Sequence, residues 1–459
     1  MKRPRIWLTL LAAALMAAAP ARAQSVLRDA ETEAFFRDIG TPLEKAAGLD
    51  PSAVTINIVG DPSINAFATL GQQVYFNSGT IVAADNVLEI QGVLAHELGH
   101  VAGGHAVRFN EGTGPATNIT LMSLVVGAAL IAAGAGEAGM AAMMAGQQAA
   151  MGKFLAFSRE QESRTDQAGA KFLDAAGVDG SGMISFFRKL AGQEYRLAIP
   201  QNQDTAYNRT HPLSAERINA LENVLERSSA WKKGPDPKLQ ARYLRIRGKL
   251  IGYISEPKET FERYPASDTS PAAHVARAYA FHKLAEPDKA AAELAPLLQQ
   301  NPNDPYLLEI EGQVMLESGR IDEAIPPLRK AVAASNGEPL IAAMLGHALV
   351  QAGEQGEKVN YDEAEKVLRT ALARDYRNPF GWMQLETVYE RKGDVPRRAL
   401  ATAERLSLEG GDPRATLMAA QTAAAGLPAN TPEWYRAQDI LVISREQAQN
   451  MKKNGKNRG

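Results

Sequence analysis

Short strand-like stretches precede longer helix-like stretches in the first part of the chain. Residues Ala53–Val59 alternate in polarity and are rich in β-branched side chains, which predicts a strand. Residues Asn65–Leu70 and Gln73–Asn77 indicate two more short strands around Gly71. Apolar positions from Val87 to Phe109 recur at helical spacing and predict one long helix. A small sheet is therefore expected to precede this helix.

Further helices are predicted on both sides of this region. The pattern of residues 25–49 predicts a helix that is broken at Pro42. Residues 158–176 predict a helix that begins at a capping-box sequence starting with Ser158. Another helix is expected over Ser214–Arg227, with the Ser214 hydroxyl as its N-cap. The first domain is thus expected to be α+β, mostly helical with a small sheet.

Residues 119–151 are almost uncharged and rich in Ala, Gly and Met. About 18 uncharged residues from Ile119 to Gly136 would be marginal for a membrane span. The glycines and Glu137 argue against a span, so the pattern favours a buried or lid-like helical hairpin. A surface for a membrane or for hydrophobic substrates is the second interpretation, and a true span is the third.

The second part of the chain is repetitive. Residues 302–335 form a 34-residue unit of two predicted helices, and related units start near Pro271, Pro339 and Pro379. This period is typical of tetratricopeptide repeats, helical hairpins that stack because none buries its apolar face alone. An all-α solenoid is therefore expected. The predicted division of the chain is a first domain at 24–228, a linker at 229–238, a repeat domain at 239–450 and a disordered tail at 451–459.

Composition excludes several classes of function. The 459 residues are 45% hydrophobic and 22% charged, with a formal net charge of −2. The clustered basic stripe of nucleic-acid-binding proteins is missing, so no nucleic-acid partner is expected. The chain has no cysteine, which excludes disulfides, a thiol nucleophile, thiolate-bound zinc and a lipid-modified N-terminal Cys.

Residues 1–23 have the features of a secretory signal peptide. A basic segment from Lys2 to Arg5 precedes an apolar segment from Ile6 to Ala19 and an A-x-A cleavage site at Ala21-Arg22-Ala23. An uncleaved membrane anchor is the alternative, but the apolar segment is short for a span. Export without cysteine is compatible with an oxidising compartment such as a bacterial periplasm.

The strongest chemical signal is the H-E-x-x-H motif His96-Glu97-Leu98-Gly99-His100. Histidines four apart share one face of a helix, so both rings can point at one metal ion. Glu97 lies one step round the helix, where it can reach a water on that metal. Two imidazoles suit Zn²⁺, and a catalytic zinc needs a third protein ligand and an open position. Histidines that are merely exposed or hydrogen-bonded are the alternative.

Glu162 is the predicted third ligand, with Asp166 one turn later on the same face of its helix. Asp166 is then placed to accept a hydrogen bond from the second ring nitrogen of a zinc-bound histidine. A solvated, charged helix face is the alternative for both carboxylates. His105 lies one residue before the position that a metzincin motif requires, so it is interpreted as a structural histidine.

Two residues after the helical region have several interpretations. His211, next to a proline, is a surface residue, a fourth zinc ligand that closes the site, or an oxyanion stabiliser. Arg217 pairs with a carboxylate of the site or lies on the surface.

Together these segments resemble the HtpX-like gluzincin peptidases, and the signal peptide and repeats resemble their periplasmic members. Arg164 is a departure, because relatives often carry an acidic residue there. The resemblance covers nearly the whole mature chain, and it rests on His96–His100, Glu162-x-x-x-Asp166, Ile64–Ala68, Val74–Gly79, and His211-Pro212-Leu213 with Arg217.

The resemblance implies a zincin-like domain that binds one Zn²⁺ through His96, His100 and Glu162. It implies Glu97 as general base and Asp166 as the partner of a ligand histidine. His211 would occupy the open position of the zinc and hold the enzyme latent, and residues 119–151 would lie over or beside the site. The strand expected to receive substrate as an added β-strand comprises Asn65, Ala66, Phe67 and Ala68.

The expected function is zinc-dependent cleavage of misfolded or misassembled outer-membrane proteins in the periplasm, with chaperone-like help in their assembly. The repeats would dock on an outer-membrane assembly complex, and the chain would contact a membrane peripherally. The alternative is a chaperone or scaffold that docks through its repeats, with proteolysis secondary.

Overall fold

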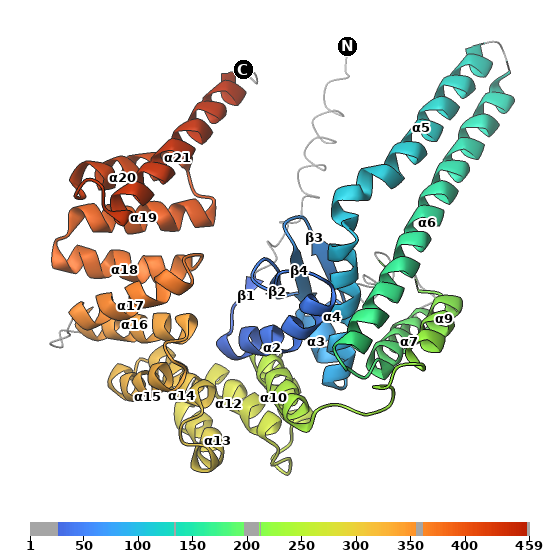
Figure 1. The fold of residues 1–459 in the computed structure, drawn as a ribbon. Coiled ribbons are helices and arrows are strands. Elements are labelled where there is room, and N and C mark those ends of the chain that lie inside the picture. Colours follow the sequence, from blue (N-terminus) through green and yellow to red (C-terminus); the bar gives the residue numbers. More distant parts are fainter. Residues whose placement is uncertain (1–25, 133–134, 197–210, 212, 355–360, 457–459) are drawn as a thin grey trace, which may run out of the picture. The chain divides into compact units, whose positions relative to one another are not determined.

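The computed structural model describes residues 26–132, 135–196, 211, 213–354 and 361–456 (Figure 1). The predicted signal peptide lies outside these residues. Two compact units are present. The first contains residues 35–243 and the described residues before Arg28, and the second contains Arg28–Ala34 and the chain from Leu244 onward. The predicted division at residues 229–238 stays a prediction, because the units divide inside helix α10.

The first unit contains one four-stranded sheet with the order β1-β2-β4-β3. β2 pairs with β4 in parallel, and the outer pairs β1–β2 and β3–β4 are antiparallel. The strands expected around Gly71 are therefore present, and β3 lies at an edge of the described sheet. The strands span Val26–Leu27 (β1), Thr55–Val59 (β2), Ala66–Thr69 (β3) and Gln73–Asn77 (β4).

Helix α4, Val87–Ala102, carries the H-E-x-x-H motif through the core of this unit. The side chain of Asn86 caps its first turn by accepting a hydrogen bond from the backbone N–H of Glu89, 3.1 Å away. The helix was expected to continue to Phe109, and this expectation is wrong. Gly104 has a φ of +63°, a left-handed conformation that ends the helix, so a new helix begins at His105.

Helices α5, His105–Ala132, and α6, Gly136–Ala175, form a long hairpin (Figure 1). The hairpin interpretation is confirmed, but the expected helix start at Ser158 is wrong because that residue lies in the middle of α6. The two helices approach closely where a side chain would not fit. A Cβ at Gly127 would lie 2.7 Å from the carbonyl oxygen of Gly139.

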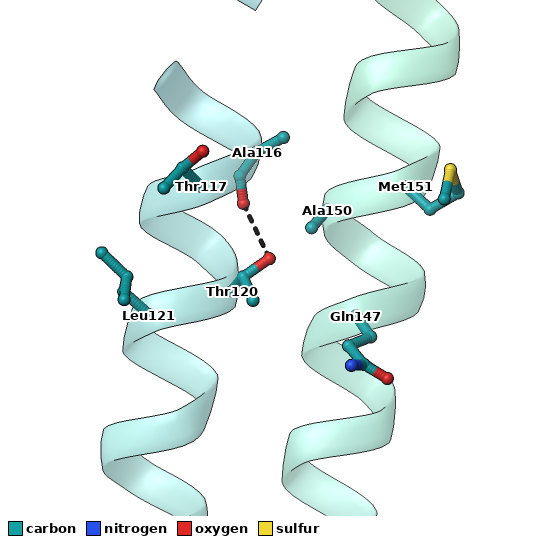
Figure 2. Close-up of a pocket in the computed structure, with 7 residues that line it drawn as sticks. All are labelled: Ala116, Thr117, Thr120, Leu121, Gln147, Ala150 and Met151. Atoms are coloured by element: carbon teal, nitrogen blue, oxygen red, sulfur yellow. Dashed lines mark hydrogen bonds between the residues drawn. The ribbon is translucent and has the colours of Figure 1, made fainter. Parts of the chain in front are cut away.

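The hairpin is not buried. Its exposed large apolar side chains are Leu121, Met122, Leu124, Val125, Val126, Met140, Met144 and Met151. A groove of about 620 Å³ runs between its helices (Figure 2) and is lined by Ala116, Thr117, Thr120, Leu121, Gln147, Ala150 and Met151. Among the described residues, no helix combines the length and the apolar character needed to cross a membrane.

Four further helices complete the described part of the first unit: α2, α3, α7 and α9. The first residues of α2, up to Ala34, belong to the second unit. Pro42 lies inside α2 and does not end it, contrary to expectation. The predicted N-cap at Ser214 is confirmed, because its hydroxyl accepts from the Arg217 backbone N–H. These helices span Ala30–Ala46 (α2), Ser78–Ala83 (α3), Ser181–Arg196 (α7) and Ala215–Leu225 (α9).

The second unit is a stack of helical hairpins, in agreement with the predicted solenoid, and most of its helices have proline in the first turn. Residues 451–456 belong to the last helix, so the disorder expected for them is wrong; 457–459 lie outside the described residues. The helices span Pro237–Ile254 (α10), Pro257–Arg263 (α11), Pro271–Lys283 (α12), Pro287–Gln300 (α13), Pro305–Glu317 (α14), Ile321–Ala334 (α15), Pro339–Glu354 (α16), Tyr361–Arg374 (α17), Pro379–Lys392 (α18), Val395–Glu409 (α19), Pro413–Gly426 (α20) and Pro432–Lys456 (α21).

Partly buried ion pairs join residues 28–34 to the rest of the second unit. Asp29 pairs with Lys249. Glu31 pairs with Arg245, whose other nitrogen lies 2.6 Å from Asp304. Ala30 packs in an apolar cluster with residues of α14, α15 and α16. Paired charges at these depths fix the segment in one position, because breaking a buried pair leaves an uncompensated charge.

Candidate metal centre

Three helices and one loop residue bring the predicted site residues together in the first unit. α4 contributes His96, Glu97 and His100, whose side chains meet because residues four apart lie on one face. Glu162 comes from α6, which packs against α4. His211 lies just before α9. The only described group of side chains that could hold a metal ion is His96, His100, Glu162 and His211.

The ligand groups of the four residues lie at similar distances from one another. Nε2 of His96, Nε2 of His100 and Nδ1 of His211 are 3.2 Å from one another in all three pairs. The Glu162 carboxylate oxygens lie 3.3 Å from His96, 3.4 Å from His100 and 3.1 Å from His211. His96, Glu162 and His211 are buried, and His100 is nearly so. The three ring nitrogens and the Glu162 carboxylate therefore form a small, roughly tetrahedral group, in which Oε2 of Glu162 faces His96 and Oε1 faces His100 and His211.

Asp166 and Arg217 form hydrogen bonds to His96 and Glu162 on the side away from the centre of the group. Oδ1 of Asp166 is 3.0 Å from Nδ1 of His96, the ring nitrogen that faces away from the tetrahedron. Arg217 donates from Nε to Oδ2 of Asp166 at 2.9 Å and from its terminal nitrogen to Oδ1 at 3.0 Å. The same terminal nitrogen lies 3.1 Å from Glu162. Arg217 thus joins the carboxylate behind one histidine to the carboxylate in the tetrahedron.

Electrostatics favour a positive charge at the centre of this tetrahedron. Burial lowers the pKa of His96, but the hydrogen bonds that its ring donates to Asp166 and Glu162 outweigh burial and raise the pKa to about 10. Burial raises the pKa of Glu162, but His211 and His96 outweigh it and hold that pKa well below its usual range. A cation bound among these groups meets an ionised carboxylate and imidazole lone pairs, the donor set that divalent transition metals prefer.

Glu97 lies beside the tetrahedron and is fully buried. Its Oε1 is 3.7 Å from Nε2 of His211, and neither carboxylate oxygen makes a hydrogen bond of good geometry with a described residue. Burial raises the pKa of Glu97, and the backbone N–H of Ala68 in β3 opposes the shift. A buried carboxylate with oxygens left over is suited to accept a proton from a bound water.

β3 lies next to the motif helix. The strand contacts α4, and within the described sheet it pairs on one side only, with β4. Ala66 is buried, whereas Phe67 and Ala68 are partly exposed. Asn65 precedes the strand, and its backbone is hydrogen-bonded to the Thr80 hydroxyl. The strand that contains three of the four residues predicted as a substrate edge therefore contacts the motif helix, and the backbone N–H of Ala68 interacts with Glu97.

His105 contacts the site residue His100, which the sequence did not predict. Its Nδ1 is 2.9 Å from Nδ1 of His100 and 3.2 Å from the Thr165 hydroxyl. The spacing excluded His105 as a third metal ligand and gave no sign of a partner. The pair of glycines before it was the available signal, because such a pair breaks the helix and turns His105 back toward His100.

The geometry brings together four side chains that could hold one metal ion, with the buried carboxylate of Glu97 beside them, an arrangement that a metallopeptidase requires. Residues 11–225 match the family model "Peptidase family M48". This segment is similar to that family, and the chain is a metallopeptidase.

Curated relatives match much more of the chain. The "Beta-barrel assembly-enhancing protease" of Yersinia pestis is 27% identical over 383 residues, which cover 82% of this chain and 76% of the relative. The protein of the same name from Escherichia coli (strain K12) is 24% identical, covering 82% and 75%. The "Metalloprotease LoiP" of Escherichia coli (strain K12) is 27% identical over 39% of this chain. A solved structure, "Crystal structure of MamA", covers 38% of this chain at 19% identity and a TM-score of 0.28.

Proposed function

We propose that this protein is a zinc endopeptidase of the periplasm that degrades misassembled outer-membrane proteins. We further propose that His211 holds it latent. The observation that carries the zinc assignment is the regular spacing of the four donor atoms. A tetrahedral ion with zinc–nitrogen distances of about 2.05 Å requires its ligands to be roughly 3.3 Å apart. The separations of 3.1 to 3.4 Å among the three ring nitrogens and the Glu162 carboxylate oxygens fit that requirement.

A bound Zn²⁺ would lower the pKa of a coordinated water and polarise the scissile carbonyl. In this mechanism Glu97 takes the proton of the attacking water and passes it to the leaving amine. Asp166 keeps His96 in the tautomer and orientation that a ligand needs. His96, His100 and Glu162 are the three permanent ligands.

Latency is proposed because four protein ligands leave no position for a water. Structural zinc sites are closed by four protein ligands, whereas catalytic sites keep one position open. His211 is the ligand most easily moved, because it precedes α9 and does not lie within a helix. Its departure would create the open position beside Glu97.

The substrate class follows from β3 and from the relatives. The side of β3 that has no partner strand in the described sheet can bind an extended chain through main-chain hydrogen bonds, with little demand on its sequence. Unfolded polypeptides offer such segments and folded proteins do not. The relatives are named for the assembly of β-barrels, which points to outer-membrane proteins as substrates.

A chaperone or scaffold role is the second candidate, and the repeat array supports it. Stacked helical hairpins present extended surfaces to other proteins. The array could dock the enzyme on an outer-membrane assembly complex while the metal site acts on failed substrates. The exposed apolar side chains of the hairpin support a further contact with a lipid surface.

Metal content tests the proposal first. The mature protein is purified without chelators, and its zinc is measured by mass spectrometry beside that of Glu162→Ala. We expect about one zinc per chain in the wild type and a large loss in the variant, which lacks one of three permanent ligands. A wild type that contains no zinc and takes up none when zinc is offered would overturn the enzyme assignment.

A further inference from the structure

We propose that His105 is a positioning residue for the metal ligand His100, and that Gly103 makes room for its ring. Nε2 of His100 faces the other three ligand atoms, so Nδ1 of the same ring points away from them. That nitrogen meets Nδ1 of His105 at 2.9 Å. The inference rests on the proposed metal site.

The chemistry of a bound imidazole fixes the direction of this hydrogen bond. When Nε2 of His100 binds a metal, Nδ1 carries the proton and must donate it. Nδ1 of His105 must then be the acceptor, because two N–H groups 2.9 Å apart would repel each other. Metal binding therefore selects the form of His105 that is unprotonated at Nδ1.

The turn between α4 and α5 places His105 for this contact. Gly104 has a φ of +63°, which turns the chain so that the first residue of α5 lies against the last turn of α4. A Cβ at Gly103 would lie 2.5 Å from Nε2 of His105 and 2.9 Å from its Cδ2. Gly103 itself has a φ of −72°, which alanine adopts without strain. Glycine is needed at 103 for space and at 104 for its backbone conformation.

Thr165 supports the ring of His105 from the other helix. Its hydroxyl lies 3.2 Å from Nδ1 of His105, to which it can donate its proton, and 2.9 Å from the carbonyl oxygen of Gln161. A Cβ at Gly99 would lie 2.9 Å from Cγ2 of Thr165, so α4 and α6 approach closely at this level. Thr165 directly precedes Asp166, so adjacent residues of α6 support the two histidine ligands.

The two ligands therefore have different partners. His96 is held by an anionic carboxylate that is itself bound by Arg217. His100 is held by a neutral imidazole. A carboxylate makes a bound imidazole a stronger donor to the metal than a neutral acceptor does. His105 thus orients His100 without adding charge to a centre that already holds two carboxylates.

Zinc affinity of the full mature protein tests the inference, measured by competition with a chromophoric chelator. His105→Leu removes the acceptor, and we expect its zinc affinity to fall about 10- to 100-fold. His105→Asn places an amide oxygen near the position of Nδ1, and we expect it to restore most of the affinity. Gly103→Ala leaves His105 in the sequence but displaces its ring, and we expect a loss close to that of His105→Leu.

Two further readouts separate positioning from folding. We expect the metal-free variants to keep the circular dichroism of the metal-free wild type. With Co²⁺ in place of zinc, His105→Leu should change the visible absorption bands, which report ligand geometry, whereas His105→Asn should keep them. If both His105→Leu and Gly103→Ala bind zinc as tightly as a zinc-binding wild type, the inference is wrong and the metal site stands. A wild type that binds no zinc overturns both.

Discussion

Arg217 binds Asp166 through two nitrogens, at 2.9 and 3.0 Å, and Asp166 in turn lies 3.0 Å from the ring of His96. The arginine lies 51 residues after the aspartate, and its terminal nitrogen also lies 3.1 Å from Glu162. Arg217 therefore restricts the Asp166 carboxylate, and Asp166 in turn orients the ring of His96. A two-pronged pair restricts rotation of the carboxylate more than a single hydrogen bond does.

Arg217→Lys keeps the charge but loses the planar fork, so it separates geometry from electrostatics. We expect kcat at saturating zinc to fall about 10- to 100-fold, with a smaller change in KM, because the ligand set is disordered and the substrate edge is not touched. Kinetics on an unfolded outer-membrane protein measure this. A kcat equal to that of the wild type would show that charge alone matters at this position.

His211→Ala should raise proteolysis. The alanine opens the fourth position while His96, His100 and Glu162 keep the metal, so we expect about one zinc per chain and faster cleavage of unfolded protein. Initial rates at equal zinc loading measure the effect. If His211 instead stabilises the developing oxyanion, the rate falls by roughly 100-fold and the latch proposal fails.

Glu97→Gln separates the two candidate functions. The amide cannot take the proton of water, so cleavage should fall by about 10²- to 10⁴-fold while zinc content stays at the wild-type level. Chaperone-like assistance of outer-membrane protein assembly should survive. Cleavage that persists at the wild-type rate would exclude Glu97 as general base.

The helical part of the site could be predicted from the sequence because its spacing is local. Residues four apart share one helix face whatever the rest of the chain does, so His96 and His100 could be paired with confidence in their geometry. Glu162 and His211 lie far along the chain, and only packing of α4, α6 and the segment before α9 brings them within 3.4 Å. The sequence pattern predicted Glu162 as the third ligand and left three interpretations for His211, and the resemblance to a family selected the role of His211.

The wrong predictions concern helix boundaries and long-range contacts, which local sequence patterns do not determine. The apolar pattern was continued through Gly103 and Gly104, so His105 was placed inside a helix and not at the turn that directs it to His100. Ser158 begins a capping-box sequence, but the pattern carries no information that α6 already extends from Gly136. Residues 28–34 join the second unit through ion pairs that span more than 200 positions, and no periodicity reveals such pairs.

Glu309 gives the second unit a dependence on pH. Burial raises the pKa of this α14 carboxyl from 4.5 to about 8, although Lys249 opposes the shift. Between these two values the folded protein keeps a proton that the unfolded chain has lost. The free energy of unfolding should therefore fall as pH rises through this window, by up to about 1.4 kcal/mol per pH unit.

Glu309→Gln removes this titration at nearly constant volume, so its stability should depend less on pH and should exceed that of the wild type near pH 8. Urea unfolding in the presence of a chelator, at about pH 5 and about pH 8, measures the difference. Glu262→Gln, at an exposed position of α11, is the matched control and should follow the wild type. If the free energy of unfolding changes equally with pH in Glu309→Gln and in the wild type, Glu309 is not the group that causes the pH dependence.

The hairpin should carry any affinity of the protein for lipid. Met122 and Val125 on α5 and Met144 on α6 are each more than 60% exposed, within a segment where Glu137 is the only charged residue between Glu111 and Lys153. Replacing all three with Gln should weaken co-flotation with phospholipid vesicles at least about tenfold, because each apolar side chain contributes on the order of 1.5 kcal/mol or more when buried. Zinc content should not change, since the substitutions lie far along the helices from the ligands.

Met418→Gln, equally exposed on α20, is the control and should bind vesicles as the wild type does. Equal flotation of the triple variant and the wild type would exclude the hairpin as a lipid contact and leave its apolar surface to protein substrates.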